Sequence, residues 1–444
     1  MSESASAPFA AMAPESAGRP APRPEWNFAT RSFFRLACVY WLLYSLPSTG
    51  RISFFGVIPG AQAYKSVWES IGRWVAVHAF HLSGPVTVSR FTGSGDTTLD
   101  YIEELCFLVL TCAAVLAWSF ADRNRQGYQT LHSWLRLLVR YTLAITLLSY
   151  GFSKVFPLQF PFPGLSRMIE PFGAFSPMGV LWEFMGSSPA YTIFAGMMET
   201  LGGALLLFRR TTTLGALVSA GVLLNVVVLN FCYDVPVKLY SLNLLLMAVF
   251  LMAPDLGKLT GLLVLNRPAA PVTASGPVFE KRWMRIGALS IKILFIGFFP
   301  LQNALQSYQF YKSAVLNPTN RPPLYGLYQV ESFKQNGKEV PPLMTDVSRW
   351  KMVVAQNATI IQVRMMDDTV RGFAAQYDAS ASTVTLTEIS KIILTYSRAD
   401  ADHVVLTGTL DNDLLEIHLR RKDPSEFLLV NRGFHWISET PFNR

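Results

Sequence analysis

Long apolar segments fill most of the first two thirds of the chain and limit the folds that it can adopt. A helix needs about 20 mainly apolar residues to cross a bilayer. Charged residues make up 15% of the chain, against about 25% in soluble proteins. The sequence therefore predicts a bundle of about seven transmembrane helices, at roughly 31–47, 101–120, 135–156, 190–208, 212–232, 238–254 and 284–305.

Basic residues between these segments predict the orientation of the bundle, because cytoplasmic loops are enriched in Lys and Arg. Seven alternating spans place the basic groups after the second, fourth and sixth spans on one side. The N-terminus is then inside and the C-terminus outside, as in a multi-pass protein of the bacterial inner (cytoplasmic) membrane. The net charge is +8, but the basic residues lie at the ends of apolar segments and form no single stripe. We therefore expect no nucleic-acid partner.

Composition divides the chain into three parts. Residues 1–28 are rich in Ala, Pro and Ser and predict a disordered cytoplasmic tail. Residues 29–310 hold the predicted transmembrane domain. Residues 320–444 contain short alternating runs separated by polar turns, which predict an extracytoplasmic antiparallel β-barrel or sandwich. The ending "RGFHWISETPFNR" is expected to close the barrel core, or else to form a contact strip, with its aromatic residues Phe434, Trp436 and Phe442.

Ionisable residues inside the predicted spans are the first candidates for a site, since charge within hydrocarbon is costly. Glu199 lies about nine residues into the fourth span, roughly 13 Å deep at 1.5 Å per residue. Lys154 ends the third span in "LSYGFSKVFP", and Tyr150 lies one turn earlier on the same helix face. A lysine at a helix end can instead extend to the membrane surface, and a glutamic acid can simply join two helices.

The next two spans add amides and further charges. Asn225 is expected near the depth of Glu199, and the other polar residues crowd the outer end of the bundle. Amides also hold helices together in lipid, so a structural role and a site are both open. We predict Lys154, Glu199 and Tyr150 as catalytic residues. We predict the substrate- or cofactor-binding residues as Asn225, Asn230, Asp234, Lys238 and Asn243.

Metal and thiol chemistry have weak support in the sequence. The four cysteines include no C-x-x-C pair. His78 and His81 have a spacing that suits one metal ion on a helix face, but no further ligands are apparent, so we predict no metal site. Asp96 or Thr97 is expected to cap the second span.

Residues 135–256 resemble the DoxX-like membrane proteins. "RYTLAITLLSYGFSK" is similar to the family's Arg, apolar helix and Gly-x-x-Lys pattern, and "METLGGALLLFRR" to its Glu-x-x-Gly-Gly helix with a basic pair. This resemblance implies a small helical bundle. It also implies a link to quinone-dependent oxidation of sulfur compounds or to thiol-stress redox complexes.

The same stretch is similar to the membrane domain of vitamin K-dependent γ-glutamyl carboxylase and its bacterial HTTM relatives. In that family the lysine of Gly-x-x-Lys acts as a base on the hydroquinone, and Lys154 in "YGFSK" matches it. The family also has a β-rich outer domain. Where it has a histidine in the helix after the basic pair, this chain has Asn225.

Three functional hypotheses follow, and they leave open whether the protein is an enzyme. The favoured one is a quinone-linked oxidoreductase or subunit, in which Lys154 and Glu199 polarise a quinone head group in the outer half of the membrane. The second is a carboxylase-like enzyme with Lys154 as base. The third is a non-catalytic anchor or transporter whose β domain binds a lipid or an envelope partner. The expected partners are membrane lipid, a quinone and a redox or envelope protein.

Overall fold

Six helices in the described part of the chain are long and apolar enough to cross a membrane, as in a multi-pass membrane protein. The computed structural model describes residues 26–46, 60–84, 93–268, 281–316, 321–388, 391–410 and 413–443. Residues 1–25, most of the predicted tail, lie outside them. The six are α4 (Thr98–Ala121), α5 (Gln129–Val155), α8 (Pro189–Leu207), α9 (Thr212–Cys232), α10 (Lys238–Met252) with its continuation α11 (Leu256–Leu263), and α12 (Arg282–Tyr311).

The prediction of a bundle of about seven spans is confirmed, with six of the seven predicted segments among these candidates. The first predicted span is a helix, α1 (Phe28–Ser45), which packs beside α4 and α5 but is not among the six. Its first half carries Arg31 and Arg35, and these two charges lower its apolar character. The buried Arg35 guanidinium donates to the Tyr128 hydroxyl and to the Asp122 carbonyl, which ties α1 to the end of α4.

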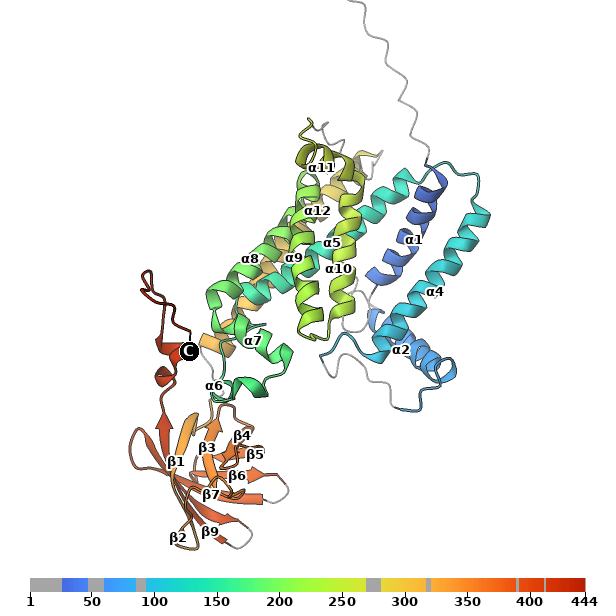
Figure 1. The fold of residues 1–444 in the computed structure, drawn as a ribbon. Helices are drawn as coiled ribbons and strands as arrows, with labels where there is room; N and C mark the ends of the chain where they lie inside the picture. Colours follow the sequence, from blue (N-terminus) through green and yellow to red (C-terminus); the bar gives the residue numbers. More distant parts are fainter. Residues whose placement is uncertain are drawn as a thin grey trace, which may run out of the picture.

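Local sequence signals explain where the helices begin. Thr97 and Asp100 form a reciprocal capping box at the start of α4, so the predicted cap is confirmed for Thr97. Ser188 caps α8, and Pro189 occupies its first turn, where a missing N–H costs nothing. The chain before α4 forms the amphipathic helix α2 (Ala61–His78), which lies across the lower end of α4 in Figure 1.

The C-terminal domain is a closed antiparallel barrel, so the barrel form of the prediction is confirmed. Eight strands form the barrel wall, and β1 pairs with both β3 and β9 to close it. The short β2 (Lys338–Glu339) adds to the end of β1 through a turn in which Asn336 and Gly337 have positive φ. The wall strands are β1 (Gly326–Gln335), β3 (Trp350–Ala355), β4 (Ile360–Met365), β5 (Val370–Asp378), β6 (Thr383–Thr387), β7 (Lys391–Arg398), β8 (His403–Leu410) and β9 (Asp413–Lys422).

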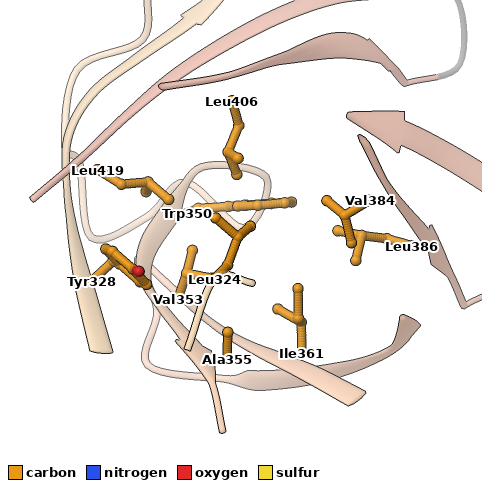
Figure 2. A pocket seen from close by; sticks show the side chains of 10 residues that line it. All are labelled: Leu324, Tyr328, Trp350, Val353, Ala355, Ile361, Val384, Leu386, Leu406 and Leu419. Carbon is orange, nitrogen blue, oxygen red and sulfur yellow. The ribbon is translucent and has the colours of Figure 1, made fainter. Parts of the chain in front are cut away.

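Side chains fill the barrel interior. Figure 2 shows Trp350 lying across the centre, with aliphatic residues from neighbouring strands pointing toward it. The space left between them has a volume of about 10 Å³, which is room for about one water molecule. The interior is a packed core and offers no room for a lipid. The cavity is lined by Leu324, Tyr328, Trp350, Val353, Ala355, Ile361, Val384, Leu386, Leu406 and Leu419.

The C-terminal aromatic residues do not close this core, which corrects the expectation for "RGFHWISETPFNR". Phe434 is 77% exposed and Trp436 is 91% exposed, while Phe442 is 44% exposed. The pairing of β1 with β9 already closes the barrel, so the last residues are not needed for closure.

The barrel touches the helical domain through the loop that follows α5. That loop contains two short helices, α6 (Leu165–Met168) and α7 (Pro177–Ser187). Leu165 packs with Leu327 of β1 and Val354 of β3 in one buried cluster. Figure 1 shows α6 directly beside the upper ends of these strands. The barrel is thus held at the end of the bundle where α5 finishes.

Candidate functional site

Lys154 and Glu199 form a buried ion pair between α5 and α8. The Lys154 Nζ donates to Glu199 Oε2 at 2.7 Å and to Oε1 at 2.9 Å. Lys154 is 7% exposed and Glu199 is 5% exposed. The lysine therefore points into the bundle and does not extend to the membrane surface. Two charges so well removed from solvent are stable only because each compensates the other.

Small residues let α5 and α8 approach closely enough for this contact. A Cβ added to Gly196 would lie 2.7 Å from the Gly151 carbonyl oxygen and 2.7 Å from the Lys154 Cβ. Gly203 meets α5 in a similar way at Ala144, further along the helix pair. Close backbone approach through glycine is a common way for helices to associate in lipid. The same glycines that join the helices therefore set the reach of Lys154 to Glu199.

Aromatic hydroxyl groups border the ion pair. The Lys154 ammonium lies 5.6 Å from the centre of the Tyr150 ring, within the range of a cation–π contact. The Tyr150 ring centre is 6.2 Å from that of Tyr240 on α10, and the Tyr240 hydroxyl is 3.3 Å from the Thr146 hydroxyl. The three residues predicted as catalytic thus lie together, while their catalytic role stays a prediction. Tyr240 belongs to the same site, although it was not among the predicted site residues.

Asn243 belongs to a second polar network. Its side-chain oxygen accepts from the Tyr40 hydroxyl at 2.5 Å, and its amide donates to Glu104 at 3.3 Å. The Tyr40 hydroxyl also contacts Glu104. This network joins α1, α4 and α10, and it brings in two residues that the sequence analysis did not single out. The "YIEEL" stretch near the start of α4 could have pointed to Glu104, because it places carboxylates within an apolar helix.

Lys238 and Asp234 lie at the exposed start of α10. The Lys238 Nζ is 2.8 Å from Asp234, whose side chain is 84% exposed. Asp96 accepts from the backbone amides of Lys238 at 2.8 Å and Leu239 at 3.0 Å. Asp96 therefore caps α10, whereas the prediction placed it at the second span. A carboxylate here stabilises the positive end of the helix dipole.

The predicted outer cluster is only partly formed. Asn230 is buried and donates to Ser241 at 3.0 Å, which fits a role in joining α9 to α10. Asn225 is exposed on α9, so it does not join Glu199 at the site. Asp234 also lies outside it, at the surface. Asn225 and Asp234 therefore do not join Lys154 and Glu199, which corrects their predicted place near that pair. The sequence of α9 is apolar on most sides and does not reveal that Asn225 faces outward.

The histidine pair before α4 shows no metal-binding geometry. His78 lies 2.9 Å from the Trp74 carbonyl oxygen, and its ring stacks on Trp74. Within the described ranges, no group of three or more His, Cys, Asp or Glu side chains could hold a metal ion.

Comparisons with known proteins give one informative match. No family model matches the chain, and no solved structure matches it. The similarities to DoxX-like proteins and to the carboxylase family therefore stay predictions. The chain is 34% identical over 123 residues to the uncharacterized protein YwoB of Bacillus subtilis (strain 168), which covers 28% of this chain and 78% of YwoB. At this identity and coverage, the chain belongs to the same family as YwoB.

Proposed function

We propose that the protein is a quinone-linked membrane oxidoreductase, or the quinone-binding subunit of one. The observation that carries the proposal is the buried Lys154–Glu199 pair beside Tyr150. A strongly paired charge in an apolar bundle is a default candidate for function. An electron-donating partner protein is part of the proposal, because the reduction of a quinone needs a source of electrons.

The donors at the ion pair suit a quinone carbonyl. An ammonium has three N–H donors, and the two oxygens of Glu199 take two of those of Lys154. The Tyr150 hydroxyl has no hydrogen bond to any described residue. One ammonium N–H and one phenol O–H therefore remain to bind a carbonyl oxygen. A bound quinone would accept electrons, while Lys154 supplies or holds the proton at that oxygen and Glu199 keeps the ammonium in position.

The carboxylase-like alternative fits this geometry less well. A lysine that acts as a base must offer a free electron pair. Here both oxygens of Glu199 contact the Lys154 nitrogen, so a substrate proton would have to compete with that contact. The filled barrel interior also gives no support to the alternative in which the barrel encloses a lipid. A partner bound on the outer surface of the barrel stays a prediction.

Bound quinone in the purified protein tests the proposal. The full chain is purified from membranes that contain quinone, and organic extracts are analysed by chromatography and ultraviolet absorbance. We expect quinone in the wild type and in Lys258→Ala, which removes a lysine paired to Asp255 at the other end of the bundle. We expect its loss in Lys154→Ala and in Tyr150→Phe. Absence of quinone from the wild type, together with unchanged behaviour of Lys154→Ala, would overturn the proposal.

A further inference from the structure

A cluster of positive charge lies at the end of the bundle opposite the ion pair. Arg140 is on α5, fourteen residues before Lys154 and therefore about 21 Å from it along the helix at 1.5 Å per residue. Its Nη1 donates to the Thr212 hydroxyl, at the start of α9, at 3.3 Å. Arg209 lies just after α8 ends. This end also carries the basic loops, so we call it the basic end.

Arg140 is buried without a carboxylate partner. It is 8% exposed, and its Nε has no hydrogen-bond partner. Its guanidinium lies 4.9 Å from the centre of the Tyr141 ring. A buried cation normally has a counter-charge, because desolvation of an isolated charge is costly. Arg140 thus presents an unpaired N–H donor and an uncompensated charge inside the bundle.

Two further cations face the same place. Lys292 of α12 is half-buried, and the charges of Arg140 and Arg209 both act on it. Among the described residues, none of these three cations forms an ion pair. The nearby carboxylate of Asp255 is already shared by Arg136 at 3.7 Å and Lys258 at 3.5 Å. The cluster therefore has an excess of positive charge that the chain does not neutralise.

The setting of the cluster favours a lipid. The rings of Tyr141 on α5 and Phe295 on α12 meet at 5.4 Å, so α12 rests on α5 within one turn of Lys292. Beside Lys292, Leu289 and Ile293 are 57% and 61% exposed and offer an apolar surface for acyl chains. Basic pockets between helices at the cytoplasmic side of membranes bind anionic lipid head groups.

We propose that Arg140, Arg209 and Lys292 bind the phosphate group of an anionic phospholipid at the basic end of the bundle. The phosphate oxygens accept from the side chains of Arg209 and Lys292, and the phosphate charge compensates the buried Arg140 guanidinium. The acyl chains lie along the exposed apolar face of α12. Arginine suits this role because its planar group matches the geometry of phosphate.

The test measures the thermal unfolding of the full-length purified protein in a neutral detergent. Phosphatidylglycerol, phosphatidylcholine and inorganic phosphate are titrated separately. We expect phosphatidylglycerol alone to raise the unfolding temperature in a concentration-dependent way, as any ligand of the folded state does. The variants Lys292→Gln and Arg209→Gln should each weaken phosphatidylglycerol binding by about 10-fold or more, since each loses a charge-assisted hydrogen bond.

Arg210→Gln is the matched control, because Arg210 is an exposed arginine next to Arg209. It should bind phosphatidylglycerol like the wild type. Arg140→Gln should weaken binding most. If the Arg140→Gln protein does not fold, Lys292→Gln and Arg209→Gln still test the proposal. Equal stabilisation by phosphatidylcholine, or equal binding by wild type and both variants, would overturn the proposal. A response to inorganic phosphate equal to that of the lipid would show a soluble anion site instead.

Discussion

At the scale of single residues, depth in the membrane and partner choice decide what each polar group does. Lys154 and Glu199 were predictable as candidates, because Glu199 lies mid-span and Lys154 ends a span with Tyr150 on the same face. Their mutual contact at 2.7 Å was not predictable, because it depends on how closely α5 and α8 approach. The contact of Asp96 was also not predictable. Asp96 precedes α4 in the sequence, but its carboxylate caps α10.

The ion pair predicts a specific pattern of stability. Glu199→Met leaves the Lys154 charge buried and uncompensated, so we expect a loss of about 3–5 kcal/mol in the free energy of unfolding. Lys154→Met should cost a similar amount for the reverse reason. The double variant Lys154→Met/Glu199→Met should recover most of the loss, because two apolar side chains replace the two charges together. Thermal unfolding of the four proteins in one detergent measures this. Additive losses in the double variant would contradict a compensating pair.

At the scale of elements, the contact of α5 with α8 depends on glycine. Gly196→Ala places a methyl group 2.7 Å from the Gly151 carbonyl oxygen, so the helices must separate. We expect a loss of about 1–3 kcal/mol, as for other overpacked interfaces. Quinone binding should weaken as well, because Lys154 and Glu199 move apart.

Gly221→Ala on α9 is the control for this prediction, because a Cβ added there meets nothing within 4 Å. It should be neutral or slightly stabilising, since alanine favours a helix. Thermal unfolding and quinone content measure both variants. Equal effects of the two substitutions would show that helix propensity, rather than close approach, explains the result.

The turns of the barrel give a prediction for acid. Side-chain donors of Asn336 and Gln335 hold the pKa of Asp413 below its ordinary value of 3.8, and this bond joins the β1 turn to the start of β9. A carboxyl with a lowered folded-state pKa stabilises the fold above pH 3.8 and loses this effect as pH falls through the folded value. Barrel unfolding, followed by tryptophan fluorescence, should therefore become easier below pH 3.8.

Asp413→Asn should reduce this acid dependence, because the titrating group is gone while the side-chain oxygen remains. Asp423→Asn is a comparison outside the barrel turns, in the 3-10 turn after β9. An acid response that is the same in the wild type and Asp413→Asn would show that other carboxyl groups dominate.

The elements differed in how well their sequence signals worked. Alternating runs predict the barrel, but β3 alternates poorly, and its pairing with β4 has a register shift between Trp350 and Met352. The period of α9 was also uninformative, so the sequence did not show that Asn225 lies on an exposed face. Helix existence was easier to predict, since length and apolar character suffice. Only α1, with its two arginines, is not among the six candidate spans.

At the scale of the whole molecule, the barrel meets the bundle at a small apolar contact. Leu165→Asp places a charge in the cluster with Leu327 and Val354. We expect the barrel to lose its docked position while both domains stay folded, because each has its own core. Limited proteolysis should then cut faster between residues 311 and 326. Leu343→Asp, at a leucine that is 56% exposed, is the control and should leave the cleavage rate unchanged.

The contact at Leu165 also has a mechanical consequence. A domain that is connected by one flexible linker can change its orientation without moving its neighbour. This barrel follows α12 in sequence and is also gripped at α6, so its attachments lie on two separate segments of the bundle (Figure 1). A movement of the barrel would therefore act first on the loop that leaves α5, about ten residues beyond Lys154. The barrel is therefore joined to the bundle close to the buried charges.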